Sequence, residues 1–250
     1  FRQELNFSRF DIVAGALQRL VEERTCEWVK KAITKTGIKN IALAGGVFMN
    51  VKANQNISEL SEVNNIFIMP SCGDESNAIG DCFYGYHLYC KNHGLNFDPR
   101  PITHLYLGPE YNNDYIENLI RERNLEKGYR IKKLKNINYE IAKLLAEGFI
   151  VARCSGRSEW GARALGNRSI LANPLHKDTI RILNETIKDR DFFMPFTPSI
   201  LDTFEKKYVI NSKNIFAPYM VITFNSTELA RSHIPAAMHP YDFTIRPQIV

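Results

Sequence analysis

Short apolar segments alternate with longer amphipathic segments along this chain of 250 residues, and this alternation restricts the fold more than any other feature. Apolar residues at three-to-four spacing predict a helix over 11–36, which Gly37 would end, because glycine readily adopts the left-handed conformation found after a helix. The short apolar run at 40–44 is typical of a strand in a covered parallel sheet. Helices and strands that alternate in this way build α/β layers, so we predict a mixed α/β fold. We further expect strands at 65–69, 129–131, 149–153, 208–210, 219–224 and 248–249, helices at 112–123, 138–147 and 177–188, and an aromatic-rich helix that runs through Cys90.

Glycines and arginines are interleaved between Gly156 and Ile170, in the run GRSEWGARALGNRSI. Glycines beside arginines allow the backbone to bend tightly around a small group. The guanidinium group matches the oxygens of a phosphate or carboxylate in a bidentate way. The run therefore predicts a site for an anion such as a phosphorylated small molecule. A solvated, charged loop is the alternative, but it would not need the large apolar residues that lie among or close to these charges: Trp160, Leu165, Ile170, Leu171, Phe192, Phe193 and Phe196.

A second polar stretch follows and adds Lys188 and Arg190 at the end of the helix expected over 177–188. Six arginines and two lysines lie between Arg153 and Arg190, both included. This density extends the predicted anion site. Stabilisation of the helix is an alternative role for the two terminal cations, because the helix dipole favours positive charge at a C-terminus.

Two glycines, Gly45 and Gly46, follow the strand expected at 40–44 and precede a helical segment. Free backbone N–H groups at such a turn can hold a phosphate, although a pair of glycines alone is more often structural. Asn50 and Asn54, one helical turn apart, either line the same cleft or cap a helix. Asp74 follows the strand at 65–69, where an acidic residue can cap a helix, bind a metal or act as a base.

The composition excludes several classes of protein. Hydrophobic residues make up 44% and charged residues 24%, which is typical of a globular rather than a disordered chain. The net charge of +5 suits small anions but is too weak to indicate nucleic acid. No run reaches the roughly 18 apolar residues of a membrane span, no secretory signal opens the chain, and the five cysteines lack paired spacing. We expect reduced thiols, a cytoplasmic location, no membrane partner, and a fragment of a longer protein.

Two long blocks resemble the carboxy-terminal domain of the O-carbamoyltransferase family, which includes the nodulation-factor and cephem-antibiotic carbamoyltransferases. They are GRSEWGARALGNRSILANP at 156–174 and KDRDFFMPFTPSIL at 188–201. The segments GGVFMNVKAN at 45–54 and PSCGDESNAIG at 70–80 resemble the last third of the family's amino-terminal domain. The proline- and glycine-containing stretch at 94–111 is typical of a linker into a new domain. The resemblance implies the end of an actin/hexokinase-like domain over 1–100 and a truncated YrdC-like domain over 101–250.

The resemblance also implies roles for individual residues. Gly45 and Gly46 would approach the phosphates of the nucleotide or of carbamoyl-adenylate, with Asn50 beside them. Asp74 would be one ligand of a divalent metal, Fe or Mg, whose histidine ligands would lie upstream of this segment. The implied catalytic residues are Arg163, Lys188 and His239, and the implied ligands of nucleotide and carbamoyl phosphate are Arg157, Glu159, Asn167, Arg168, Ser169, Arg190, Ser199 and Arg246.

The function implied by the resemblance is ATP-dependent O-carbamoyl transfer. Carbamoyl phosphate and ATP would give carbamoyl-adenylate, whose carbamoyl group would pass to a hydroxyl of a small-molecule or sugar-derived acceptor. Arginines and a lysine would hold the two polyanions together and stabilise charge that develops at the α-phosphate. One alternative is a YrdC-type nucleotide- or RNA-binding module in tRNA threonylcarbamoylation. Another is a relative that binds without catalysis; the acceptor and the existence of a homodimer stay open.

Several positions depart from the family pattern. Ala162 replaces a usual proline, Asp191 stands where Glu is common, and Glu75 follows the metal-binding aspartate where a small residue is usual. Met194 replaces an arginine, which removes one positive charge. The turn after His239 is also longer than in the family. Altered affinity or substrate choice, or a role in binding alone, would follow from these differences.

Overall fold

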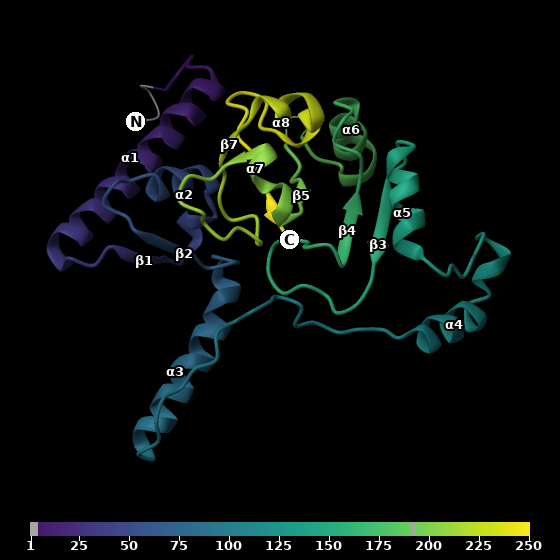
Figure 1. The fold of residues 1–250 in the computed structure, drawn as a ribbon, viewed down its shortest axis with the longest axis horizontal. Helices are drawn as coiled ribbons and strands as arrows, with labels where there is room; N and C mark the ends of the chain where they lie inside the picture. The colour runs from purple at the N-terminus through teal and green to yellow at the C-terminus, as the bar shows by residue number, and fades with distance from the viewer. Residues whose placement is uncertain (1–4, 192–193) are drawn as a thin grey trace. The chain divides into compact units, whose positions relative to one another are not determined.

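The computed structural model describes residues 5–191 and 194–250, which form two compact units that are each considered separately (Figure 1). The first unit contains the chain up to Ile79, together with Thr197–Glu228 and Tyr241–Val250. The second contains Gly80–Phe196 and Leu229–Pro240. Two segments from the end of the chain therefore belong with its beginning. The division into family domains at residue 100 stays a prediction.

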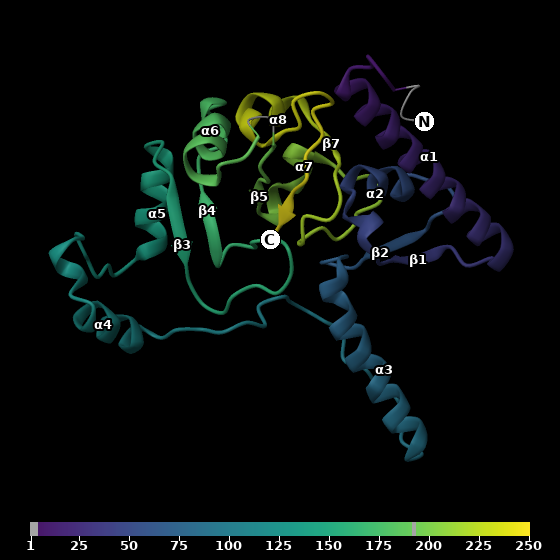
Figure 2. The same ribbon diagram turned by 180° about the vertical axis from the view of Figure 1, so that it is seen from behind.

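A long helix and a pair of parallel strands form the amino-terminal part of the first unit (Figure 2). Helix α1 (Phe10–Thr36) ends at Gly37, whose φ of 72° and N–H bond to the carbonyl of Ile33 confirm the predicted stop. Strand β1 (Asn40–Leu43) pairs in parallel with β2 (Asn65–Ile68), as predicted. The elements around these strands are the 3-10 helix η1 (Gly46–Met49), helix α2 (Val51–Ser58) and the 3-10 helix η2 (Asp74–Ser76). Helix α3 (Asn77–Asn92) begins at the end of this segment and belongs to the second unit from Gly80 onward.

Segments from the end of the chain complete the core of the first unit. Strand β5 (Ser199–Ile200) pairs in parallel with β8 (Gln248–Ile249), and β6 (Val209–Ile210) pairs in antiparallel fashion with β7 (Asn225–Ser226). Two short helices, η5 (Asp202–Phe204) and α7 (Glu205–Tyr208), lie between β5 and β6. Within the first unit, one apolar cluster joins the amino-terminal part to these later segments. It contains Leu43, Ile57, Ile68, Cys72, Ile200, Val209, Ala217, Ile222, Phe224 and Ile249.

The strand predicted over 219–224 is wrong. Only Phe224 in this stretch makes a β-bridge. The backbone of the segment finds its partners elsewhere, since the carbonyl of Val221 accepts a hydrogen bond of 2.8 Å from the side-chain amide of Asn54 in α2. A backbone carbonyl that already accepts a hydrogen bond from a helix side chain does not need a strand partner, whatever the β-propensity of the residues.

A two-stranded antiparallel sheet lies at the centre of the second unit's regular structure. Strand β3 (Val151–Cys154) pairs with β4 (Arg168–Leu171). The helices expected over 112–123 and 138–147 are confirmed as α4 (Asn113–Glu122) and α5 (Ile137–Ala146). The helix expected over 177–188 is split into α6 (Asp178–Arg181) and the π-helix η4 (Ile182–Lys188). The remaining helices are η3 (Leu125–Lys127), α8 (Glu228–His233) and η6 (Pro235–Ala237).

The strand predicted at 129–131 is also wrong, because this segment has no regular structure. Tyr129 and Ile131 are 70% and 40% exposed. A short apolar run needs a neighbouring strand and a buried face to become a strand, and these residues gain neither. Propensity alone therefore misled the prediction here.

Helices and strands are mixed throughout, which confirms the α/β class. Among the described residues, no helix combines the length and the apolar character that crossing a membrane requires. The five cysteines are free thiols, as predicted. Burial raises the pKa of the Cys72 thiol to about 11, so this thiol is protonated at neutral pH.

Candidate anion-binding site

The loop that joins β3 to β4 contains most of the predicted site residues, and we call residues 155–167 the hairpin loop. The strand register places Cys154 opposite Arg168, and the N–H of Ser155 donates to the carbonyl of Asn167 at 3.0 Å. Both ends of the hairpin loop are therefore fixed by a backbone ladder. Strand β3 and the loop that follows it confirm the prediction, whereas strand β4 was not predicted from the sequence.

Glu159 organises the hairpin loop from within. Its Oε1 atom accepts hydrogen bonds from the N–H groups of Leu165 and Asn167, both at 2.8 Å, and of Arg168 at 3.1 Å. Burial pushes the pKa of this carboxyl upward, but the backbone N–H donors outweigh burial, and the net pKa is lowered. The family resemblance implied that Glu159 binds nucleotide or carbamoyl phosphate. In the structure, this carboxylate holds backbone.

Arg168 and Asn167 also bind the loop's own backbone. The Nη1 atom of Arg168 donates to the carbonyl of Ser155 at 2.8 Å, and its Nη2 atom donates to the carbonyl of Gly156 at 3.0 Å. The Nδ2 atom of Asn167 donates to the carbonyl of Arg157 at 2.8 Å. In both predicted anion ligands, side-chain donors are therefore already bonded to backbone carbonyls of the loop.

Glycine and serine complete the turn. Gly156 and Gly166 have φ values of 55° and 112°, which favour glycine. A Cβ atom on Gly156 would also lie 3.2 Å from the amide nitrogen of Asn167. The Oγ atom of Ser169 accepts a hydrogen bond of 2.9 Å from the N–H of Gly166. The tight bending predicted from the glycines is confirmed.

Residues 105–109 pack against the hairpin loop, although the sequence assigned them to a linker. The Nε and Nη2 atoms of Arg157 donate to the carbonyls of Gly108 and Leu107, both at 3.0 Å. The N–H of Trp160 donates to the carbonyl of Leu105 at 2.7 Å. A Cβ atom on Gly108 would lie 2.7 Å from the hydroxyl of Ser158, so this glycine permits the close approach. The apolar run ending in Gly108 was the signal that could have revealed this contact.

Arg163 differs from the other arginines of the hairpin loop. Its side chain is partly buried, and burial lowers the pKa of its guanidinium. Within residues 5–191 and 194–250, Arg163 makes no hydrogen bond and no ion pair. A partly desolvated cation without a carboxylate is costly unless an anion completes it. Arg163 is therefore the strongest candidate ligand for an anion in the loop.

Three further predicted residues belong to the same compact unit as the hairpin loop. Lys188 is exposed at the end of η4. Arg190 is partly buried, and its guanidinium carbon lies 4.5 Å from the centre of the Phe196 ring. His239 is exposed and follows η6. Their roles as catalytic or anion-binding residues stay predictions.

The predicted phosphate turn lies in the first unit. Gly45 has a φ of 105°, and a Cβ atom on Gly45 or Gly46 would meet no described atom within 4 Å. Asn50 caps α2, because its Oδ1 atom accepts a hydrogen bond of 3.0 Å from the N–H of Ala53. It also exchanges hydrogen bonds with Gln18. The backbone of the two glycines is therefore exposed. Asn50 caps the helix, which is one of the two roles that the sequence left open for it.

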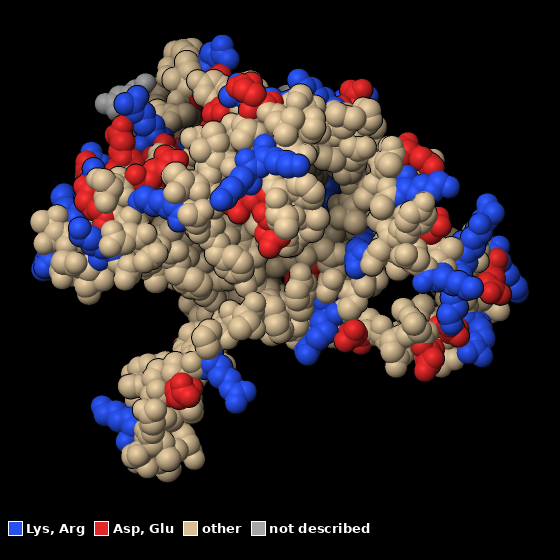
Figure 3. Space-filling model, viewed as in Figure 1, with Lys and Arg blue, Asp and Glu red and all other residues tan. Residues whose placement is uncertain are grey.

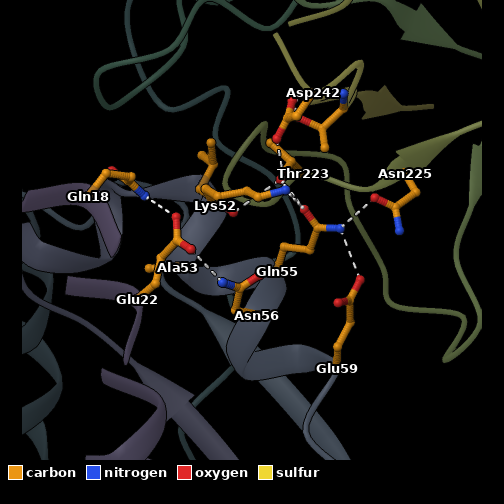
Figure 4. A network of polar contacts seen from close by, with 12 residues as sticks. Gln18, Glu22, Lys52, Ala53, Gln55, Asn56, Glu59, Thr223, Asn225 and Asp242 are labelled. Atoms are coloured by element: carbon orange, nitrogen blue, oxygen red, sulfur yellow. Dashed lines mark hydrogen bonds and ion pairs between the residues drawn. The ribbon is translucent and has the colours of Figure 1, made fainter. Parts of the chain in front are cut away.

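Helix α2, which follows this turn, is fixed by polar side chains from the end of the chain (Figure 4). Lys52 pairs with Asp242 at 2.9 Å. The hydroxyl of Thr223 donates to Oε1 of Gln55 at 2.9 Å, and Nε2 of Gln55 donates to Oδ1 of Asn225 at 3.2 Å. The helix that follows the glycine turn is therefore held by residues far away in sequence, such as Thr223, which is 168 positions from Gln55.

The predicted ligands Ser199 and Arg246 lie at the β5–β8 pair of the first unit. The hydroxyl of Ser199 donates to Oε1 of Gln248 at 2.8 Å. The Nε and Nη2 atoms of Arg246 donate to the hydroxyl oxygen of Thr197 at 3.1 and 2.8 Å. Ser199 thus contacts a residue of strand β8, and Arg246 contacts Thr197, which lies just before β5.

Asp74 is the predicted metal ligand, and it is exposed at the start of η2. Among the described residues, no three or more histidine, cysteine, aspartate or glutamate side chains form a group that could hold a metal ion. The neighbouring Glu75 accepts a hydrogen bond from the hydroxyl of Ser71, which lowers the pKa of Glu75. These residues do not fit a metal site by themselves, so no chemical step is assigned to a metal here.

Two family models match the chain in sequence order. The model described as "Carbamoyltransferase N-terminus" matches residues 2–83, and the model described as "Carbamoyltransferase C-terminus" matches residues 142–250. This chain belongs to the carbamoyltransferase family. The second match includes the whole hairpin loop with Lys188, Arg190 and His239, and the first includes the glycine turn and Asp74.

The relatives of this carbamoyltransferase chain are longer proteins. An uncharacterized protein of Methanocaldococcus jannaschii is 33% identical over 95% of this chain and 38% of the relative. An uncharacterized protein of Synechocystis is 32% identical over 88% of this chain and 35% of the relative. Nodulation protein NolNO of Sinorhizobium fredii is 29% identical over 95% of this chain and 34% of the relative. The chain thus spans between about a third and two fifths of these relatives.

The environment of Glu159 predicts a pH dependence of stability. Because the folded-state pKa of Glu159 is lowered, its contribution to stability is present above the unfolded value of about 4.3 and is lost as the pH falls through the folded pKa. Thermal unfolding measured from pH 7 to pH 3 should show a smaller acid-induced loss in Glu159→Gln than in the wild type. Glu126→Gln, at an exposed glutamate that bonds to no described residue, is the control and should follow the wild type. Parallel curves for Glu159→Gln and the wild type would contradict this assignment.

Proposed function

We propose that the protein is an ATP-dependent O-carbamoyltransferase. It would use carbamoyl phosphate and ATP to form carbamoyl-adenylate and would pass the carbamoyl group to a hydroxyl of a small-molecule or sugar-derived acceptor. The observation that carries the proposal is Arg163, a partly buried cation with no partner among the described residues, in a loop that matches the carbamoyltransferase C-terminal model. Binding of the acceptor and a cytoplasmic location belong to the same proposal.

The residues of the hairpin loop would then divide into two groups. Glu159, Asn167 and Arg168 would shape the loop, since each already binds its backbone. Arg163, with Lys188 and Arg190 of the same unit, would neutralise the phosphates of ATP and carbamoyl phosphate. Positive groups that hold two polyanions together both orient the reactants and stabilise charge that develops in the transition state.

Within the first unit, the open turn at Gly45 and Gly46 would leave room for a phosphate at the backbone of these glycines. Asp74 would serve a divalent metal, Fe or Mg, only together with ligands outside the described residues. When bound, such a metal would supply Lewis-acid polarisation of an oxygen. The described chain itself would bind and orient the phosphates.

The charge distribution supports small anions over RNA as the ligand. On the face drawn in Figure 3, acidic side chains lie among the basic ones over much of the surface. The net charge is only +5 for 250 residues. Proteins that bind nucleic acid through its backbone gather lysine and arginine on one face or stripe. The mixed surface therefore supports the transferase over the RNA-binding alternative.

Calorimetric titration of the full-length protein with ATP, with and without carbamoyl phosphate, tests the proposal. We expect saturable binding in the wild type and a Kd about tenfold to a hundredfold weaker in Lys188→Ala, because hydrogen bonds to charged groups contribute about 1.5–3 kcal/mol. Lys127→Ala, at an exposed lysine of η3, is the matched control and should bind as the wild type does. Absence of ATP binding by the wild type would overturn the proposed function.

A further inference from the structure

The end of η4 departs from regular helix geometry around one asparagine. The carbonyl oxygen of Asn184 accepts the N–H of Asp189 and, at 3.1 Å, the N–H of Arg190. Asp189 has a φ of 45°, which is uncommon for a residue other than glycine. π-helical turns are rare and are often found at functional sites. The backbone at Arg190 is therefore held by a residue six positions earlier.

The side chain of Asn184 holds the same arginine a second time. Asn184 is 0% exposed, and its Oδ1 atom accepts a hydrogen bond of 2.7 Å from Nε of Arg190. Its Nδ2 atom donates to the carbonyl of Met194 at 3.1 Å, which fixes the orientation of the amide. A buried amide with both ends engaged is a rigid acceptor. Asn184 thus restrains Arg190 through backbone and side chain together.

The guanidinium of Arg190 is restrained on one edge and stacked on a ring. Nε bonds to Asn184, and the Phe196 ring centre lies 4.5 Å from the guanidinium carbon. Within the described ranges, the Nη groups of Arg190 make no hydrogen bond, and no carboxylate pairs with it. The N–H donors of the Nη1–Nη2 edge are therefore available, and this edge can bind an oxyanion in a bidentate way.

We propose that Asn184 is a positioning residue that directs the Nη edge of Arg190 to an oxyanion of the substrate, a phosphate of ATP or of carbamoyl phosphate. This inference rests on the proposed function. An amide suits the task because it orients the guanidinium without neutralising it. A carboxylate at the same place would also orient Arg190, but it would cancel the charge that attracts the phosphate.

A double-mutant cycle in the full-length protein tests this role, with ATP and carbamoyl phosphate as calorimetric probes. Asn184→Ala and Arg190→Ala should each weaken binding of at least one probe by about tenfold or more. The double variant should bind like Arg190→Ala alone, because Asn184 acts through Arg190. Asn118→Ala is the matched control, since it removes an exposed Asn–Arg hydrogen bond of 2.9 Å to Arg121 in α4, and it should leave binding unchanged.

Asn184→Asp is the second variant, because removing a buried amide can impair folding. Asn184→Asp keeps an acceptor for Nε of Arg190, so this variant should fold. It should weaken binding at least tenfold when Arg190 is present and should have no effect when it is combined with Arg190→Ala. Additive losses, or unchanged binding in both Asn184 variants, would overturn the inference while ATP binding by the wild type upheld the proposed function. Wild-type protein that binds neither probe would overturn both.

Discussion

Replacing Glu159 with Ala should weaken ATP binding by about a hundredfold and lower the free energy of unfolding by about 2–3 kcal/mol. The substitution leaves the N–H groups of Leu165, Asn167 and Arg168 without their shared acceptor. Hydrogen bonds to a charged group contribute about 1.5–3 kcal/mol, and donors left unpaired add to the cost. A loop that loses this centre should no longer hold Arg163 in place. Calorimetry and thermal unfolding of the full-length protein measure the two effects.

Glu159→Gln separates charge from shape in this experiment. The amide oxygen can still accept hydrogen bonds, so the loss of stability should be smaller than in Glu159→Ala. Glu126→Ala is the matched control at an exposed glutamate and should change neither quantity. If Glu159→Ala bound ATP normally, the carboxylate would not be the centre of the site.

Replacing Arg163 with Met should have opposite effects on binding and on stability. ATP binding should weaken by about tenfold to a hundredfold, because a charged donor is removed. The melting temperature should stay the same or rise, because Arg163 is partly buried without an ion pair to a described residue. An apolar side chain of similar length avoids that desolvation cost. Residues placed for function often lower stability in this way.

Two variants make the Arg163 experiment specific. Arg163→Lys keeps the charge but not the planar fork, so its binding should lie between those of the wild type and Arg163→Met. Arg130→Met, at an exposed arginine that bonds to no described residue, is the control and should bind normally. A clear loss of stability in Arg163→Met would show that this arginine has a structural partner instead.

Local rules were enough for much of the framework. Gly37 ended α1 because glycine adopts the left-handed conformation at low cost, and the sequence carries that information directly. The apolar run at 40–44 became a parallel strand as expected. Local rules failed at 129–131 and 219–224, where the expected strands had no sheet partner. Strand formation depends on a second segment, which no short window of sequence contains.

The site divides in the same way. The sequence alone predicted the tight bending at the glycines, the family and the set of arginines, but it did not predict strand β4, which makes the loop part of a hairpin. The tertiary structure decided which of those arginines are already engaged. Arg157 donates to carbonyls about fifty residues away, whereas Arg163 contacts no polar partner among the described residues. The sequence does not distinguish one arginine from another, because only the fold determines which carbonyls lie within hydrogen-bond distance of each guanidinium.

Asn184 shows most directly what each level determined. In the sequence, Asn184 shares a helix face with Ile180, Leu183 and Ile187, and a polar residue among apolar ones was the available signal. It did not reveal that the helix becomes a π-helix there, with Arg190 turned back onto the amide. The sequence determined the helix and the family because both follow from residue types at local spacing. The tertiary structure decided the orientation of the charges because hydrogen bonds between distant residues form only once the chain has folded.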